Sequence, residues 1–192
     1  MQRIQVMGTS GSGKSTVGLR LAEAFGAPHV ELDAINWLPG WTERDHEGFR
    51  ALVAEATAGD RRVVSGNYLS RMHDILWGRA DTVIWLDLPL HLTIYRQLTR
   101  SWRRWRSNEL LWGTNYERFF PQLKVWDPNS LPGFAIRNRP KQRRMLIEAM
   151  ADPRWAHIRF VRLTSQREID RFVASLLASA SQRPSEPVED RA

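Results

Sequence analysis

Residues 8–16 read GTSGSGKST and carry the clearest chemical signal in the chain, because glycines, hydroxyls and one lysine follow a short β-rich run. The spacing Gly8-x-x-x-x-Gly13-Lys14-Ser15 fits the phosphate-binding P-loop pattern at every specified position. Glycines let backbone N–H groups approach a phosphate, the lysine adds charge at the β- and γ-phosphates, and the serine hydroxyl is a ligand for Mg²⁺. The pattern predicts a site for ATP and Mg²⁺, whose cofactor-binding residues are Gly8, Thr9, Ser10, Gly11, Ser12, Gly13, Lys14, Ser15 and Thr16.

Other interpretations of this stretch fit the sequence less well. A dinucleotide-binding fingerprint requires glycine where the chain has Thr16. The Asn-Lys-x-Asp base reader of a GTPase is absent. A plain glycine turn with an exposed lysine is the structural alternative, but the β-rich run before the motif and the amphipathic helix after it favour a P-loop.

Polar residues follow three other β-rich runs, at the sheet edge where a doubly wound fold binds its ligands. Asp33 is the predicted catalytic carboxylate, because it follows the second run and can orient an acceptor hydroxyl or a Mg²⁺-bound water. A helix cap or turn is the structural alternative for Asp33. The third run leads into Gly66 and Asn67, which together with Arg71 are predicted to hold an anion of the acceptor. Asp87, after the fourth run, is interpreted as structural.

The segment NWLPGW, residues 36–41, places two tryptophans around a Pro-Gly turn. Trp37 is predicted to wall the site of a flat acceptor group, although packing of this loop against the core is an equally good interpretation. The predicted substrate-binding residues are thus Asp33, Trp37, Gly66, Asn67 and Arg71, and the predicted metal ligands are Ser15 and Asp33.

A basic segment from residue 96 to residue 144 holds 12 Lys and Arg against 3 Asp and Glu, while the rest of the chain has a net charge of −2. Arg96 and Arg100 share one helical face, and Arg137 and Arg139 lie where the segment returns, so a lid carrying these arginines is predicted to close on transferring phosphates. A solvated arginine face and a nucleic-acid surface are the alternatives. The predicted catalytic residues are Lys14, Asp33, Arg96, Arg100, Arg137 and Arg139.

Five β-rich runs alternate with helical patterns, which predicts an α/β fold: a parallel sheet with helices on both faces. The runs cover residues 3–7, 29–32, 62–65, 82–86 and 157–163. Capping-box spacings predict helix starts at Thr42, with Asp45, and at Ser165, with Glu168. One domain over residues 1–178 is expected, with a lid-like excursion at about 100–140 and a disordered tail over 179–192.

Composition excludes several classes of protein. The chain of 192 residues has no cysteine, so it has neither disulfides nor thiolate metal sites. Its five histidines show no i, i+4 pairing, which argues against zinc. No apolar run approaches the 18 or so residues of a membrane span, and no signal peptide is visible, so a cytoplasmic location is expected.

These motifs resemble the adenylate-kinase-like P-loop family often labelled "DNA topology modulation protein", through GTSGSGKST, LDAINWLPGW, SGNY, ADTVIWLDLP and NRPK. More distantly the chain is similar to nucleoside monophosphate and shikimate kinases. The resemblance implies a P-loop three-layer sandwich of strand order 2-3-1-4-5. It also implies that Asp33 matches the acidic residue after strand two. Arg96 and Arg100 would match arginines at the start of the lid segment. Relatives carry Asp where this chain has Ser65, and the adenylate-kinase acceptor pattern is missing, so AMP is not supported as the acceptor.

The sequence therefore predicts an ATP-dependent phosphotransferase whose acceptor is a small molecule, for which a nucleoside or nucleotide is one choice. A nucleic-acid-binding protein gated by nucleotide, which would use the basic segment, is the first alternative. A regulatory ATPase whose turnover drives a partner is the second.

Overall fold

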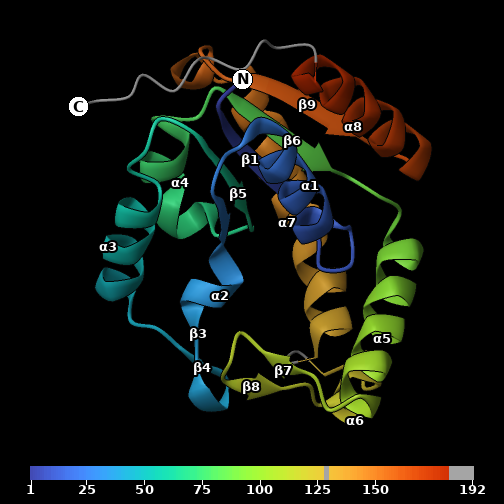
Figure 1. Cartoon of the computed structure of the whole chain (residues 1–192). Coiled ribbons are helices and arrows are strands. Elements are labelled where there is room, and N and C mark those ends of the chain that lie inside the picture. Colours follow the sequence, from blue (N-terminus) through green and yellow to red (C-terminus); the bar gives the residue numbers. More distant parts are fainter. Residues whose placement is uncertain (128–129, 182–192) are drawn as a thin grey trace.

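A five-stranded parallel sheet forms the centre of the computed structural model, which describes residues 1–127 and 130–181 (Figure 1). The strand order is β2-β5-β1-β6-β9, which is 2-3-1-4-5 when the sheet strands are counted along the chain. Every neighbouring pair is parallel. The predicted α/β fold and strand order are confirmed. The sheet strands are β1 (Arg3–Gly8), β2 (His29–Glu31), β5 (Arg62–Ser65), β6 (Thr82–Leu86) and β9 (Arg159–Leu163).

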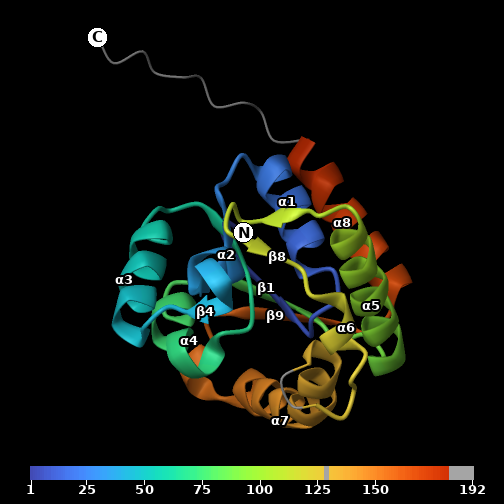
Figure 2. The ribbon, with the colours of Figure 1, turned by 90° about the horizontal axis from the view of Figure 1, so that it is seen from below.

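Helices cover both faces of this sheet, as Figure 2 shows with α1 and α7 on opposite sides of the strands. Helices α1 (Lys14–Phe25) and α8 (Gln166–Ser181) pack against one face through one buried cluster, which includes Leu21 and Val173. Helices α3 (His46–Ala56), α4 (Leu69–Trp77) and α7 (Leu131–Ala151) cover the other face. The three central strands β1, β5 and β6 are thus buried on both sides, which explains their mostly apolar sequences, whereas the edge strands β2 and β9 are partly exposed.

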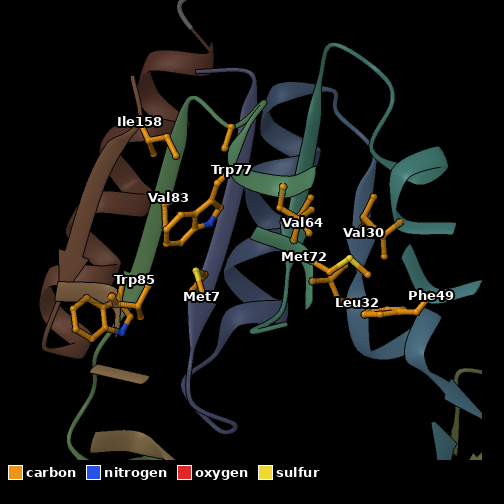
Figure 3. Close-up of a cluster of buried hydrophobic side chains, with 14 residues drawn as sticks. Met7, Val30, Leu32, Phe49, Val64, Met72, Trp77, Val83, Trp85 and Ile158 are labelled. Atoms are coloured by element: carbon orange, nitrogen blue, oxygen red, sulfur yellow. The ribbon is translucent and has the colours of Figure 1, made fainter. Parts of the chain in front are cut away.

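The core on the α3, α4 and α7 face is rich in large side chains (Figure 3). Met7, Val83 and Trp85 come from the strands, and the Trp77 side chain comes from α4. The indole N–H of Trp77 donates to the Oε1 of Gln5 at 2.7 Å, so both buried polar groups are satisfied. The packing of these side chains holds the strands β1, β5 and β6 in place, and with them the loops that follow their carboxyl ends.

Two excursions leave the carboxyl edge of the sheet and meet each other (Figure 1). The first follows β2 and contains α2 (Leu32–Asn36) and the hairpin of β3 (Trp37–Leu38) and β4 (Thr42–Glu43) around a 3₁₀ turn. The second leaves the long helix α5 (Leu90–Arg106) and returns at α7. It contains the hairpin of β7 (Leu110–Leu111) and β8 (Asn115–Tyr116) and the short α6 (Phe119–Gln122).

Several predicted boundaries differ from the observed ones. The helix expected from Thr42 begins at His46 instead, because Asp45 is its N-cap and accepts from the Gly48 N–H at 2.7 Å. Thr42 lies in β4. At Ser165 the cap is as expected, since its hydroxyl accepts from the Glu168 N–H at 3.3 Å.

The excursion expected at about residues 100–140 is shorter in the structure, since α5 runs to Arg106 and α7 begins at Leu131. The last helix continues to Ser181, so residues 179–181 are helical, and the rest of the expected tail, 182–192, lies outside the described residues. In the part of the chain that is described, no helix has the length and apolar character to span a bilayer.

Gly18 sets how closely α1 approaches the sheet. A Cβ at this position would overlap the Ser65 hydroxyl and lie 2.8 Å from Nε2 of His29. The Ser65 hydroxyl is fixed there, because it lies 2.9 Å from His29 Nε2 and donates to the Lys14 carbonyl at 3.3 Å. Ser65 therefore joins β5 to the first turn of α1.

We expect Gly18→Ala to lower the free energy of unfolding by about 1–3 kcal/mol, as overpacking does in a close-packed interior. Gly59→Ala is the matched control, because its nearest neighbour would be 3.7 Å away. Urea unfolding of both variants measures the effect. Equal stability of the two would contradict the close approach of α1 to Ser65.

Candidate active site

The P-loop connects β1 to α1. Its tight turn depends on glycines, which no other residue can replace without strain. Gly8 has φ +153°, and a Cβ there would lie 2.7 Å from the Leu86 carbonyl oxygen. Gly11 has φ +82°, and its Cβ would overlap the Thr93 carbonyl. Helix α1 has neither a side-chain cap at Gly13 nor an acidic residue in its first turn. Its N-terminal N–H groups are thus available to an anion, and the helix dipole favours one.

Asn67 holds the start of this loop in place. Its Oδ1 accepts from the Gly8 N–H at 2.9 Å, and its Nδ2 donates to the Gly8 carbonyl at 2.6 Å. Gly66 precedes it with φ +149°, and a Cβ there would lie 2.7 Å from Leu32 Cβ. The structure thus brings the predicted residues Gly66 and Asn67 to the P-loop, where Asn67 bonds the backbone of Gly8.

Two cationic and two anionic side chains converge at the N-terminus of α1: Lys14, Arg100, Glu31 and Asp33. Burial lowers the pKa of Lys14, against the opposing influence of Asp33 and Glu31. Burial likewise lowers the pKa of Arg100, whose Nη2 donates to Ser10 Oγ at 3.1 Å. The predicted residues Lys14, Asp33 and Arg100 are therefore one electrostatic group.

Glu31 belongs to this group and was not among the residues predicted from the sequence. Burial raises the pKa of Glu31, although a hydrogen bond with the Ser15 side chain opposes that shift. Its Oε1 is buried and has no hydrogen-bond partner. The spacing Glu31-x-Asp33 at the end of β2 is the signal that would have identified it, since two acidic residues there flank the sheet edge.

A divalent cation fits beside Ser15, because the orphaned Glu31 oxygen and the Ser15 hydroxyl are hard oxygen donors. Over residues 1–127 and 130–181, no group of three or more His, Cys, Asp and Glu side chains could hold a metal by itself. Glu31 and Ser15 suit Mg²⁺, which keeps several waters and binds substrate phosphates alongside one or two carboxylates.

Tyr68 fixes the orientation of Asp33. The tyrosine hydroxyl donates to Asp33 Oδ1 at 2.8 Å, and its ring packs edge-on against Phe49 at 4.9 Å. Burial, and then the Asp33 charge, raise the pKa of Tyr68, so it remains a protonated donor at neutral pH. The helix-cap alternative for Asp33 is wrong, because Glu31 occupies the N-cap of α2 and Asp33 lies inside that helix.

The remaining predicted acceptor residues lie in the first excursion and on α4. The Trp37 ring meets the Trp41 ring edge-on at 5.7 Å. Arg71 forms an ion pair with Glu43 at 3.0 Å, which connects α4 to β4. Both side chains therefore stabilise the hairpin of β3 and β4, and their contact with an acceptor stays a prediction.

The four predicted lid arginines divide into two pairs. Arg100 reaches the P-loop, and Arg96 Nη1 donates to Gln166 Oε1 at 2.9 Å, in the first turn of α8. On α7, Arg139 donates to Asp87 and Leu88, whereas Arg137 is exposed. The α5 arginines thus lie at the P-loop side, while Arg139 faces the end of β6.

The two excursions are joined by a clasp centred on Asn115, which is 2% exposed. Its Oδ1 accepts from the Trp41 N–H at 2.9 Å, and its Nδ2 donates to the Leu38 carbonyl at 3.0 Å. The Trp41 indole donates to the Tyr116 carbonyl at 3.0 Å, and its ring meets the Trp112 ring at 5.9 Å. The hairpin of β7 and β8, called the lid hairpin below after the predicted lid, is therefore bonded to the loop that follows β2.

The clasp predicts that Asn115→Ala releases the lid hairpin. Removing one buried partner costs about 1–3 kcal/mol, so amide exchange at Trp41 should accelerate by about 10- to 100-fold. Hydrogen exchange measured per residue tests this. Asn138→Ala is the control, because the Asn138 side chain donates to the Phe134 carbonyl within its own helix, α7. Unchanged exchange at Trp41 would show that the clasp does not hold the lid.

Together the fold and the site define a P-loop protein with a kinase-like sheet and two excursions over its carboxyl edge. Among solved structures, it is similar to the shikimate kinase of Acinetobacter baumannii in complex with shikimate, with a TM-score of 0.53 and 20% identity, covering 96% of each chain. The shikimate kinase of Bacteroides thetaiotaomicron gives a TM-score of 0.50 at 17% identity and covers 94% of this chain and 98% of that one. The chain therefore has the shikimate kinase fold.

Sequence comparison gives distant relatives, among them shikimate kinases, and no family model matches the chain. The uncharacterized protein YqaC of Bacillus subtilis is 27% identical over 140 residues, which cover 72% of this chain and 78% of that protein. A shikimate kinase of Symbiobacterium thermophilum is 38% identical over 98 residues, 44% of this chain and 56% of that enzyme. The matched segment thus spans about half the length of the shikimate kinase. None of these relatives has the label "DNA topology modulation protein", so that resemblance stays a prediction.

Proposed function

We propose that this protein is an ATP-dependent kinase that transfers the γ-phosphate of ATP to a hydroxyl group of a small molecule. The observation that carries the proposal is the convergence of Lys14, Arg100, Glu31 and Asp33 at the uncapped N-terminus of α1. A phosphate needs cations and backbone N–H groups, and an attacking hydroxyl needs a carboxylate close by. This one site offers both.

The roles follow from where each side chain is held. Lys14 and Arg100 neutralise negative charge on the transferring phosphoryl group, and the closed lid keeps water away from it. Asp33, held by Tyr68, orients the acceptor hydroxyl and takes its proton. Mg²⁺ bound with the nucleotide supplies further neutralisation of the phosphates, and Ser15 and Glu31 would hold it.

Three arginines of the basic segment bond to neighbouring elements of the protein instead of facing solvent, and this favours a kinase over a nucleic-acid-binding protein. A nucleic-acid groove needs its cations on an open path along the backbone of the strand. Instead Arg100 bonds Ser10, Arg96 bonds Gln166, and Arg139 bonds Asp87. Steep salt dependence of oligonucleotide binding, with no small acceptor, would support the nucleic-acid alternative.

Similarity to shikimate kinases supports a small acceptor. The shikimate kinases found by sequence comparison are 34–38% identical to this chain over 98 residues, which are 44% of it. The clasp at Asn115 adds to this, since it joins the two excursions at the carboxyl edge of the sheet, and we infer that the enclosed site suits a small acceptor better than a polymer. A screen of small hydroxyl compounds, among them shikimate, sugar acids, nucleosides and nucleotides, with γ-labelled ATP tests the proposal. Label found only in free phosphate would favour the regulatory ATPase.

Lys14→Ala is expected to lower phosphate transfer by at least about 100-fold, because it removes a preorganised charge from the site. The fold should persist, since Lys14 belongs to neither buried apolar cluster. ATP turnover and circular dichroism of the two proteins measure these effects. Equal ATP affinity and turnover in wild type and variant would contradict a role for the P-loop.

Asp33→Asn is expected to lower turnover by about 10²- to 10⁴-fold, the usual contribution of a general base, while ATP affinity changes little. Asp45→Asn is the matched control, because Asp45 caps α3 away from the site and asparagine caps a helix equally well. Steady-state kinetics and ATP titration of both variants make the comparison. Full activity in Asp33→Asn would leave Asp33 without a catalytic role.

A further inference from the structure

Several buried polar groups on the elements around the candidate active site have no hydrogen-bond partner among the described residues. They include the Oγ of Ser12 in the P-loop, the Oε1 of Glu31 on β2, and side-chain atoms of Gln97 and Ser101 on α5. The most complete case is Asn36, the last residue of α2, because it is 0% exposed and both its Oδ1 and its Nδ2 lack a partner. Burying an amide in this state destabilises the folded protein, which makes contact with a ligand the natural explanation.

The geometry of α2 places the Asn36 side chain beside Asp33. Residues three apart lie on one face of a helix, with about 5–6 Å between their Cβ atoms. The helix covers Leu32–Asn36, so Asp33 and Asn36 are neighbours of this kind. On the same helix Leu32 packs into the core and Ala34 is exposed. Asn36, four residues after Leu32 and three after Asp33, therefore projects between their two directions, toward the interior and one turn farther from the sheet.

The clasp covers the chain directly after Asn36. The Nδ2 of Asn115 donates to the Leu38 carbonyl at 3.0 Å, and its Oδ1 accepts from the Trp41 N–H at 2.9 Å. In Figure 1, α2 lies between the carboxyl edge of the sheet and the two hairpins that the clasp joins. The Asn36 amide is therefore enclosed on the side of the lid hairpin, next to the carboxylate that is predicted to meet the acceptor.

We propose that Asn36 is a specificity-determining residue, which hydrogen-bonds a second hydroxyl group of the acceptor, close to the hydroxyl that Asp33 orients. The proposal rests on the proposed kinase function and specifies the class of its acceptor as a small molecule with at least two neighbouring hydroxyl groups. A hydroxyl both donates and accepts, so it can satisfy the free Oδ1 or the free Nδ2 of the amide. An analogue without this hydroxyl leaves the buried amide unpaired and is rejected for that reason.

Thermal unfolding tests the state of the Asn36 amide without any ligand. Leucine at this position keeps a branched side chain but has no polar atom, so Asn36→Leu should leave the melting temperature unchanged or raise it by about 2–4 °C. Asn115→Leu is the matched control and should lower the melting temperature, because both polar ends of the Asn115 amide are bonded to backbone groups. A lower melting temperature in Asn36→Leu than in the wild type would overturn the proposal, since the amide would then have partners within the protein.

Paired probes that differ by one hydroxyl test the specificity. D-ribose and 2-deoxy-D-ribose, D-gluconate and 2-deoxy-D-gluconate, and adenosine and 2′-deoxyadenosine are titrated by calorimetry into the full chain saturated with Mg²⁺ and a non-hydrolysable ATP analogue. We expect the wild type to prefer the hydroxylated member of one pair by about 10-fold or more, and Asn36→Leu to bind both members of that pair alike. Asn138→Leu is the control, because the Asn138 side chain donates within its own helix, and it should keep the preference.

The outcomes separate the specificity role from the kinase function. The same preference in the wild type and in Asn36→Leu, or no preference within any pair in the wild type, would overturn the role of Asn36. Failure of the kinase proposal would appear separately, as an absence of label transfer from γ-labelled ATP to the preferred probe by a protein that still distinguishes the pair through Asn36.

Discussion

The first turn of α1 presents backbone N–H groups that no side chain among the described residues caps, and the site is arranged around them. A helix start of this kind attracts negative charge. The N-terminus of α1 is open to a ligand, because Gly13 caps the helix without a side-chain hydrogen bond and the first turn contains no acidic residue. Asn67 clamps the loop from the neighbouring strand, and Ser65 joins the same strand to the Lys14 carbonyl. The geometry of the anion site is thus set by β5 as much as by the P-loop itself.

Charge placement around this helix start follows from the order of the strands. Strand β2 ends in Glu31, directly before α2 with Asp33, and β6 leads through Asp87 into α5 with Arg100. Since all five strands are parallel, these ends lie on one edge of the sheet. The carboxylates therefore lie on the β2 side and the arginines on the β6 side, with Lys14 between them. An acceptor hydroxyl and a transferring phosphate need this opposition of charge at a short distance.

Local sequence patterns predicted the sheet and the glycine-rich loop, because each rests on a motif or period of a few residues, and the structure places Asp33 and Arg100 near Lys14, while their catalytic roles stay predictions. The clasp at Asn115 was not predictable in this way, since Asn115 and Trp41 are 74 residues apart and neither belongs to a periodic pattern. Arg139 was expected at a lid hinge. It lies instead inside α7, which begins at Leu131 and continues past Pro140, and this turns Arg139 toward Asp87. Glu31 was missed although the spacing Glu31-x-Asp33 is visible in the sequence, and its burial, which raises its pKa, is a property of the folded chain alone.

The most direct test of the account is a crystal structure of the protein with Mg²⁺ and a non-hydrolysable ATP analogue. We predict that the γ-phosphate lies at the N-terminus of α1, in contact with Lys14 and Arg100, and that the Mg²⁺ lies near Ser15. The side of the γ-phosphate that an acceptor would attack should face Asp33. A nucleotide bound elsewhere, or a γ-phosphate turned away from Asp33, would contradict phosphate transfer at this site.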